Sequence, residues 1–331
     1  MEQIISLPMI VRPVISPVDL QSTDSNKRSS FIEANTTAVA MEEVRHQHII
    51  PVFVKTNEPL ISHAEFIDAA ISIASEIFNG EQVIPPQIRV SHPVKGRIPD
   101  AKDKPAIELM EWEKTLYYER MAFVIEIPSI QTVIDGNALS LTIGGVKSYS
   151  TDNLYSRNIG DQQFKIFIGF KNTVCCNMCV WSDGYMDDVK VKSIGMLKGV
   201  IHTLLEGYNQ NYHLHHLQKL TEYSITEQQF AQLIGRCRMY NHLPADVKKD
   251  IPPMLFGDTQ MSTVVRDFYK DESFCRDANG DINLWKLYNL FTGANKSTYI
   301  DSFLDRSVNA FNFVEQVRYG LEGRADCWYL N

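Results

Sequence analysis

The cysteines near the middle of the sequence are the residues with the most obvious chemical potential. Cys176 and Cys179 form a C-x-x-C pair inside the segment 174–180, and thiolates are soft ligands that suit zinc. No second C-x-x-C or paired His/Cys motif is available to complete four ligands. On a strand, alternation would place Cys176 and Cys179 on opposite faces. We therefore predict no metal site and keep this pair only as weak metal candidates. Packed strand thiols are the favoured interpretation, and a redox pair is the other alternative.

Other motifs resemble known chemistry only in part. His213, His215 and His216 do not form H-E-x-x-H, and the segment 277–283 departs from a calcium loop because its glycine is in the fourth position. Asn295 stands where a phosphate loop needs glycine. The sequence also has no G-x-S-x-G and no kinase or Rossmann glycine loop. We therefore expect no cofactor, and we favour a protein that is not an enzyme.

Basic residues gather in a few places in an otherwise acidic chain. The sequence has 32 Lys+Arg against 40 Asp+Glu, which gives a formal net charge of -8. This balance excludes a generally basic surface, so any contact with nucleic acid must come from a local basic face. Aromatic residues near such a face would stack on single-stranded bases, while scattered surface charge is the plainer interpretation. The clusters are Arg89, Lys95 and Arg97; Arg236 and Arg238; and Lys296 with Arg306.

The first part of the chain predicts an extended arm followed by a strand-rich region. Residues 1–40 contain three prolines and then a polar stretch without sustained periodicity, which is typical of a flexible or extended arm. A strand is predicted over 49–55, and a helix from Ser62, its N-cap, to the stop at Gly80. Spacers too short for crossover helices indicate an antiparallel sheet. Its predicted strands cover 87–92, 121–128, 139–145, 164–170 and 174–181.

After about residue 193 the periodicity becomes helical. Helices are predicted over 194–220, after a capping box at Thr226 and Gln229, and at about 260–270, 283–293 and 298–320. The fold class is therefore α+β, with a central antiparallel sheet followed by and packed against C-terminal helices. The predicted organisation is an arm (1–40), a β-rich α+β region (41–192) and a helical region (193–331) that packs on the sheet as one unit.

The compartment follows from features of the whole chain. No run of about 18 apolar residues exists, and prolines and Arg12 interrupt the first 19 residues where a signal peptide would need an apolar core. Six cysteines are too few for a disulfide scaffold. We expect a cytoplasmic protein without a membrane partner.

Several longer segments resemble an uncharacterised family of unknown function from anaerobic gut bacteria. They lie at 88–101, 111–130, 141–149, 167–184, 229–244 and 283–306. The resemblance extends from about residue 45 to the C-terminal CWYLN and implies no assigned activity. The cysteine segment and the helix with Trp285 and Asn289 also resemble phage- or plasmid-like proteins of unknown function, which implies a mobile-element setting.

Polar residues inside these apolar segments are the candidate site. The first hypothesis is a non-enzymatic accessory protein of a mobile element that binds single-stranded nucleic acid or a replication or transfer partner. The alternatives are an unidentified enzyme with a polar cleft between sheet and helices, and a structural or protein-interaction module. The candidate nucleic-acid or polar-site residues are Lys147, Lys171, Asn172, Asn177, Arg236, Arg238, Lys296 and Arg306.

Overall fold

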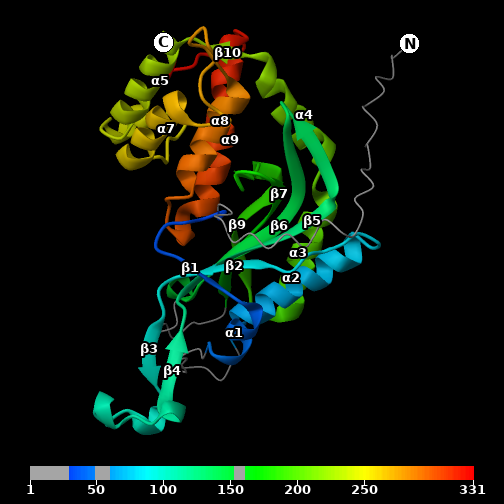
Figure 1. Cartoon of the computed structure of the whole chain (residues 1–331), viewed down its shortest axis with the longest axis vertical. Helices are drawn as coiled ribbons and strands as arrows, with labels where there is room; N and C mark the ends of the chain where they lie inside the picture. Colours follow the sequence, from blue (N-terminus) through cyan, green and yellow to red (C-terminus); the bar gives the residue numbers. More distant parts are fainter. Residues whose placement is uncertain (1–29, 49–59, 153–160) are drawn as a thin grey trace.

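The computed structural model describes residues 30–48, 60–152 and 161–331. The strand predicted over 49–55 and residues 1–29 of the predicted arm lie outside the described residues. The fold is α+β, as the sequence predicts, with a curled antiparallel sheet and helices that follow it (Figure 1).

Among the described residues, the main sheet has seven strands in the order β1-β2-β5-β6-β7-β8, with β9 also paired to β7. Each pair in it is antiparallel. The strands are β1 (Thr37–Val39), β2 (Gln87–Val90), β5 (Arg120–Ile134), β6 (Asn137–Ser148), β7 (Gln162–Asn172), β8 (Met178–Cys179) and β9 (Tyr185–Val191). The two longest strands, β5 and β6, are therefore neighbours in both sequence and space.

Local sequence explains the shape of the β5–β6 hairpin. Asp135 and Gly136 connect the strands, and both have positive φ, at 48° and 73°. Two consecutive residues of this kind are what a two-residue hairpin turn requires. The register shifts between Ile127 and Gln131, across Pro128, which has no N–H to donate to the ladder.

The strand predicted over 174–181 is wrong for most of its length. Only Met178–Cys179 forms a strand, and the preceding residues form a turn in which Cys176 has a φ of 57°. The side chain of Asn172 accepts hydrogen bonds from the backbone N–H groups of Val174 and Cys175. An asparagine that binds the backbone of following residues favours a turn over an extended strand. Because Cys176 lies in this turn, the alternation of a strand does not place Cys176 and Cys179 on opposite faces.

The helices mostly begin at side chains that cap them. Ser62 caps α2 (His63–Ile77) and Thr226 forms the capping box of α5 (Glu227–Tyr240), as predicted, and the cap at Ser62 is also a full capping box with Glu65. The single helix predicted over 194–220 is two helices, α3 (Ile194–Gly207) and α4 (Gln210–Lys219), because Asn209 caps a new start. The remaining helices are α1 (Met41–His46), α6 (Ala245–Lys248), α7 (Asp258–Lys270), α8 (Leu284–Asn295) and α9 (Ile300–Leu321). A small sheet pairs β10 (Ser224–Ile225) with β11 (Ile282–Asn283).

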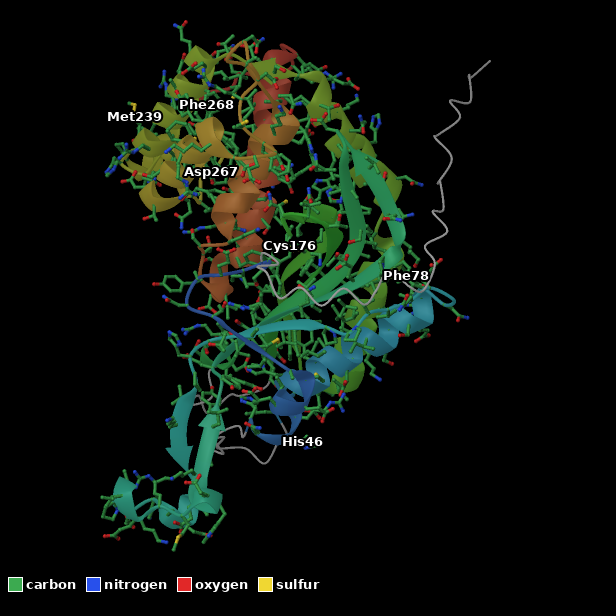
Figure 2. All side chains as sticks on the ribbon, in the orientation of Figure 1. His46, Phe78, Cys176, Met239, Asp267 and Phe268 are labelled. Carbon is green, nitrogen blue, oxygen red and sulfur yellow. The ribbon has the colours of Figure 1, made fainter. Side chains whose placement is uncertain are left out.

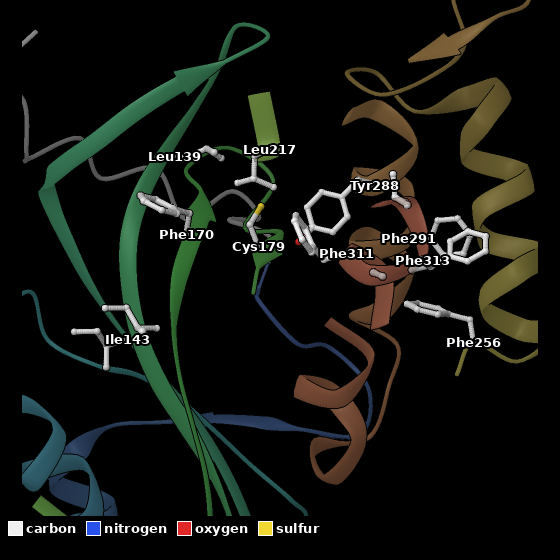
Figure 3. Close-up of a cluster of buried hydrophobic side chains, with 14 of the residues drawn as sticks. Leu139, Ile143, Phe170, Cys179, Leu217, Phe256, Tyr288, Phe291, Phe311 and Phe313 are labelled. Atoms are coloured by element: carbon white, nitrogen blue, oxygen red, sulfur yellow. The ribbon is translucent and has the colours of Figure 1, made fainter. Parts of the chain in front are cut away.

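Both faces of the sheet are covered. Helices α2 and α3 pack on one face, and α9 contacts β5, β6 and β8 from the other. Phe123 and Val124, adjacent on β5, therefore belong to two different buried clusters. The larger cluster continues from β6 and β7 through Cys179 and Leu217 to the aromatic side chains of α8 and α9 (Figure 3). The larger of the two clusters is thus continuous from the sheet to the helices.

Close packing of α2 on the sheet depends on a glycine. A Cβ at Gly145 would lie 2.5 Å from Cζ of Phe66 and 2.6 Å from the backbone oxygen of Lys165. Real Cβ atoms do not approach so closely, so the missing side chain lets the ring of Phe66 lie directly on β6.

The described part of the predicted N-terminal arm packs against the body. Phe31 and Ile32 are buried with Phe303 at the start of α9. The backbone N–H groups of Glu33 and Ala34 donate to the carbonyl oxygen of Lys296. Phe31 and Ile32 therefore form part of the core, and Thr37–Val39, as β1, form part of the sheet.

A two-stranded ribbon, β3 (Val94–Arg97) paired with β4 (Lys114–Tyr117), projects from the sheet. It lies at the opposite end of the molecule from the helices α5 and α7 (Figure 1). No helix among the described residues has both the length and the apolar character needed to cross a membrane.

Candidate functional site

Three predicted site residues, Asn172, Asn177 and Lys296, come together around the cysteine turn. The Lys296 ammonium donates to the carbonyl oxygen of Cys175, and Nδ2 of Asn177 donates to the backbone oxygen of Asn289 at 3.1 Å. All three side chains are buried. They hold the turn against α8 by making hydrogen bonds to buried backbone groups, which would otherwise lack partners.

The thiols of this region are poorly suited to chemistry. Burial raises the pKa of Cys175 to about 11 and raises that of Cys179 as well. A thiol must ionise to act as a nucleophile or a zinc ligand, and both pKa values oppose this. Within the described ranges, no group of three or more His, Cys, Asp or Glu side chains is placed to hold a metal ion.

Lys171 lies in a separate polar cluster on the sheet. Its ammonium pairs with Glu126 on β5, and the other carboxylate oxygen of Glu126 accepts a hydrogen bond from Ser140 on β6. The three strands are neighbours, so the cluster crosses the sheet. Each charged group has its partner inside the protein.

Lys147 forms a fully buried ion pair with Asp152, five residues later. Its ammonium lies 4.1 Å from the ring centroid of Phe164, and Asp152 also accepts from the backbone N–H of Gln163. Burial lowers the pKa of Lys147 and raises that of Asp152, while the attraction between the two opposes both shifts. This pair fixes the end of β6 to the start of β7.

Next to this pair, two histidines hold the backbone of Tyr118, and we call His48 and His63 the histidine clamp. Nδ1 of His48 accepts the N–H of Tyr118 at 3.0 Å, and Nε2 of His63 lies 2.8 Å from its carbonyl oxygen. The imidazoles are stacked with centroids 4.7 Å apart, and His48 also stacks on Tyr117. The clamp therefore fixes the junction between β4 and β5, where the ribbon leaves the sheet.

These contacts also fix where the protons of the clamp lie. His48 accepts through Nδ1 and His63 donates through Nε2, so both neutral rings carry the proton on Nε2. Burial lowers the pKa of His48 to about 4 and lowers that of His63 too. With its proton on Nε2, His48 has no free lone pair to offer a metal ion. The clamp is a positioning device.

The predicted arginines bind three different segments of the chain. Arg236 donates to the carbonyl oxygen of Asn331 and lies 4.7 Å from the ring centroid of Trp328. Arg238 pairs with Asp258 on α7, and Arg306 donates to the carbonyl oxygen of Leu255. The predicted lysines Lys147, Lys171 and Lys296 are buried, so they do not form an exposed basic surface with these arginines.

The ribbon and its tip form an exposed feature that sequence reasoning missed. From here on, the arm means residues 94–117 and not the N-terminal arm predicted over residues 1–40. Its stem is β3 and β4, and its tip is residues 98–113. Ile107 is 92% exposed, Met110 60% and Trp112 70%. The tip lies away from the body, at the end of the ribbon (Figure 2). The available signal was three large apolar residues among charged ones, in a segment too polar to form a core.

The tip has an internal anchor that gives it a definite shape. Glu113 is almost fully buried, accepts the backbone N–H of Met110 at 2.9 Å and pairs with Lys104. The hydrogen bond from Lys104 lowers the pKa of Glu113 below its ordinary value. The apolar side chains of the tip are therefore presented from an ordered segment.

The comparisons with known proteins identify a family. A family model described as "Domain of unknown function, B. Theta Gene description (DUF3871)" matches residues 14–330. The chain belongs to the DUF3871 family. The resemblance to an uncharacterised gut-bacterial family is thus confirmed over nearly the whole chain. No match was found among curated proteins or solved structures. The description of the family names no activity.

Proposed function

We propose that this DUF3871 chain is a non-enzymatic protein-interaction module that acts in the cytoplasm, and that its arm is the surface that binds. The observation that supports this most is the exposure of Ile107, Met110 and Trp112 at the end of an ordered ribbon. Large apolar side chains that are exposed together commonly mark an interaction site, and Trp and Met are enriched at protein interfaces.

The environment of the polar candidates supports a binding role over a catalytic one. Lys147 and Lys171 are buried in ion pairs, and Asn172 and Asn177 bind backbone groups. A general acid, base or nucleophile has to reach a substrate. Groups held in this way stabilise the fold and leave binding to the exposed arm.

In-cell photo-crosslinking tests the proposal. A photoreactive amino acid at position 112 of the full chain is expected to form adducts with protein. The same amino acid in place of Met239, which is 55% exposed on α5 at the other end of the molecule (Figure 2), is the matched control. Adducts from position 112 should disappear when Ile107→Ser and Met110→Ser are added. Adducts at 239 with none at 112 would reject the arm as the binding surface.

Nucleic-acid binding and a mobile-element setting stay predictions. Anisotropy titrations with labelled single-stranded DNA and RNA at low salt test the first of these, because phosphate contacts are strongest there. Binding that is weakened by Arg236→Gln and Arg238→Gln would show that these arginines contact nucleic acid.

A further inference from the structure

The arm carries its charges in two opposite blocks. Residues 94–117 contain five basic and five acidic residues, so the whole net charge of -8 comes from the rest of the chain. The stem has Lys95, Arg97 and Lys114 and no acidic residue, which gives a formal charge of +3. The tip has two lysines and five acidic residues, which gives -3. Most of these charged side chains are exposed.

The ribbon has further features of a surface that is completed by another chain. It forms a two-stranded sheet separate from the main one. A lone two-stranded ribbon is only marginally stable in water. Leu116 of β4 already forms a bridge with His48, so among the described residues it is the outer edge of β3 that offers backbone groups to another strand. Val94 on the stem is 50% exposed, in addition to the three apolar side chains of the tip. A partner that covers the arm would therefore gain both apolar contact and backbone hydrogen bonds.

We propose that the arm binds a second copy of this chain, with two arms lying antiparallel so that each tip meets the stem of the other. This inference rests on the proposed function and names its partner. A two-fold interface must be complementary to itself, and a +3 stem next to a -3 tip meets this requirement only in the antiparallel arrangement. Because each body carries the net charge of -8, contact through the projecting, neutral arms also keeps the two like-charged bodies apart.

Charge reversal with full-length chains tests this arrangement. The stem variant carries Lys95→Glu and Lys114→Glu, and the tip variant carries Asp103→Lys and Glu108→Lys. Wild-type chain is expected to sediment as a concentration-dependent dimer that weakens with added salt. Each variant alone places like charges opposite each other, so its dimer constant should weaken by about tenfold or more. An equimolar mixture of the two variants restores opposite charges at both contacts and should recover the dimer.

The mixture also controls for folding, since misfolded arms would not recover. Lys249→Glu with Lys270→Glu makes the same change in net charge as the stem variant, but away from the arm and on exposed residues, and should leave the dimer intact. A wild-type chain that stays monomeric at every concentration overturns the proposal. So does a mixture that does not recover although each variant alone keeps the wild-type unfolding curve, which checks for the loss of the Lys114–Glu111 pair within the arm. If the chain is monomeric but position 112 crosslinks to another protein, the interaction function stands and only the second copy is rejected. If neither occurs, both proposals fall.

Discussion

At the residue scale, the histidine clamp connects the protonation of one side chain to the place where the arm leaves the sheet. His48 can accept the N–H of Tyr118 only while its Nδ1 is unprotonated, and burial holds the pKa of His48 at about 4. His63 holds the carbonyl of the same residue. Protonation of His48 would place two donors against each other. The arm is therefore fixed most firmly while the clamp is neutral.

The clamp predicts a loss of stability in acid. The pKa of His48 falls from 6.5 in the unfolded chain to about 4 in the fold. Its contribution is therefore complete above pH 6.5 and is lost as the pH falls toward 4, by on the order of 3 kcal/mol. His48→Gln should flatten the dependence of unfolding free energy on pH between 6.5 and 4.5, measured by urea denaturation. His92→Gln, at an exposed position, should keep the wild-type slope. Equal slopes in all three proteins would refute the role of the clamp.

The Lys147–Asp152 pair predicts a strong coupling in stability. Lys147→Met leaves a buried carboxylate without its cation, and we expect a loss of about 3–5 kcal/mol. Asp152→Asn keeps an oxygen for the N–H of Gln163 but leaves the ammonium unpaired. The loss of unfolding free energy in the double variant should be smaller than the sum of the two single losses by more than about 1 kcal/mol, as is typical of groups in direct contact. Additive losses in chemical denaturation would show that the pair is not coupled.

The sequence could indicate that Lys147 is unusual but not why. A lysine within an apolar segment is visible by inspection, and so are Asn172 and Asn177. Its partner is placed by the turn after β6, and the surrounding rings come from β7 and the start of α2. Such neighbours depend on long-range packing. A lysine inside an apolar segment therefore predicts a functional site and a structural ion pair equally well.

At the element scale, signals that act within a few residues were predicted best. The capping boxes at Ser62 and Thr226 are local hydrogen-bond patterns, and both helices begin where expected. The turn at the cysteines was mistaken for a strand because its apolar residues have strand-like composition, whereas the side chain of Asn172 decides the conformation. The arm was missed because its residues form no periodic pattern and its order depends on the buried Glu113.

The contact between α2 and β6 gives a prediction at this scale. Gly145→Ala would place a methyl group 2.5 Å from the ring of Phe66 and 2.6 Å from a backbone oxygen, so strand or helix has to move. We expect a loss of about 1–3 kcal/mol in unfolding free energy. Gly199→Ala is the matched change, on an exposed helical position with no atom within 4 Å. It should be neutral or gain up to about 1 kcal/mol. Similar effects of the two changes on thermal unfolding would contradict this packing argument.

At the scale of the whole molecule, α9 connects parts of the chain that are distant in sequence. Its first turns pack on Phe31 and Ile32 and on the sheet, while Phe311 and Phe313 contact the aromatic side chains of α8 and the C-terminal segment. Asp301 and Asp305 on the same helix pair with Arg120 and Lys165 of the sheet. The strand-rich and helical regions therefore share their main structural support.

This shared support predicts that the two regions unfold together. Phe31→Ala removes a buried ring between the N-terminal segment and α9, so a loss of about 3–5 kcal/mol is expected. Because α9 belongs to both regions, the loss should move the whole transition to lower denaturant and leave it single. Far-UV circular dichroism follows the helices and strands, and fluorescence of the buried Trp285 contributes a probe from α8. Coincident curves from both probes, in wild type and variant, are the expected result. If Phe31→Ala separates the curves, the helical region folds independently of the sheet, and α9 belongs to only one of them.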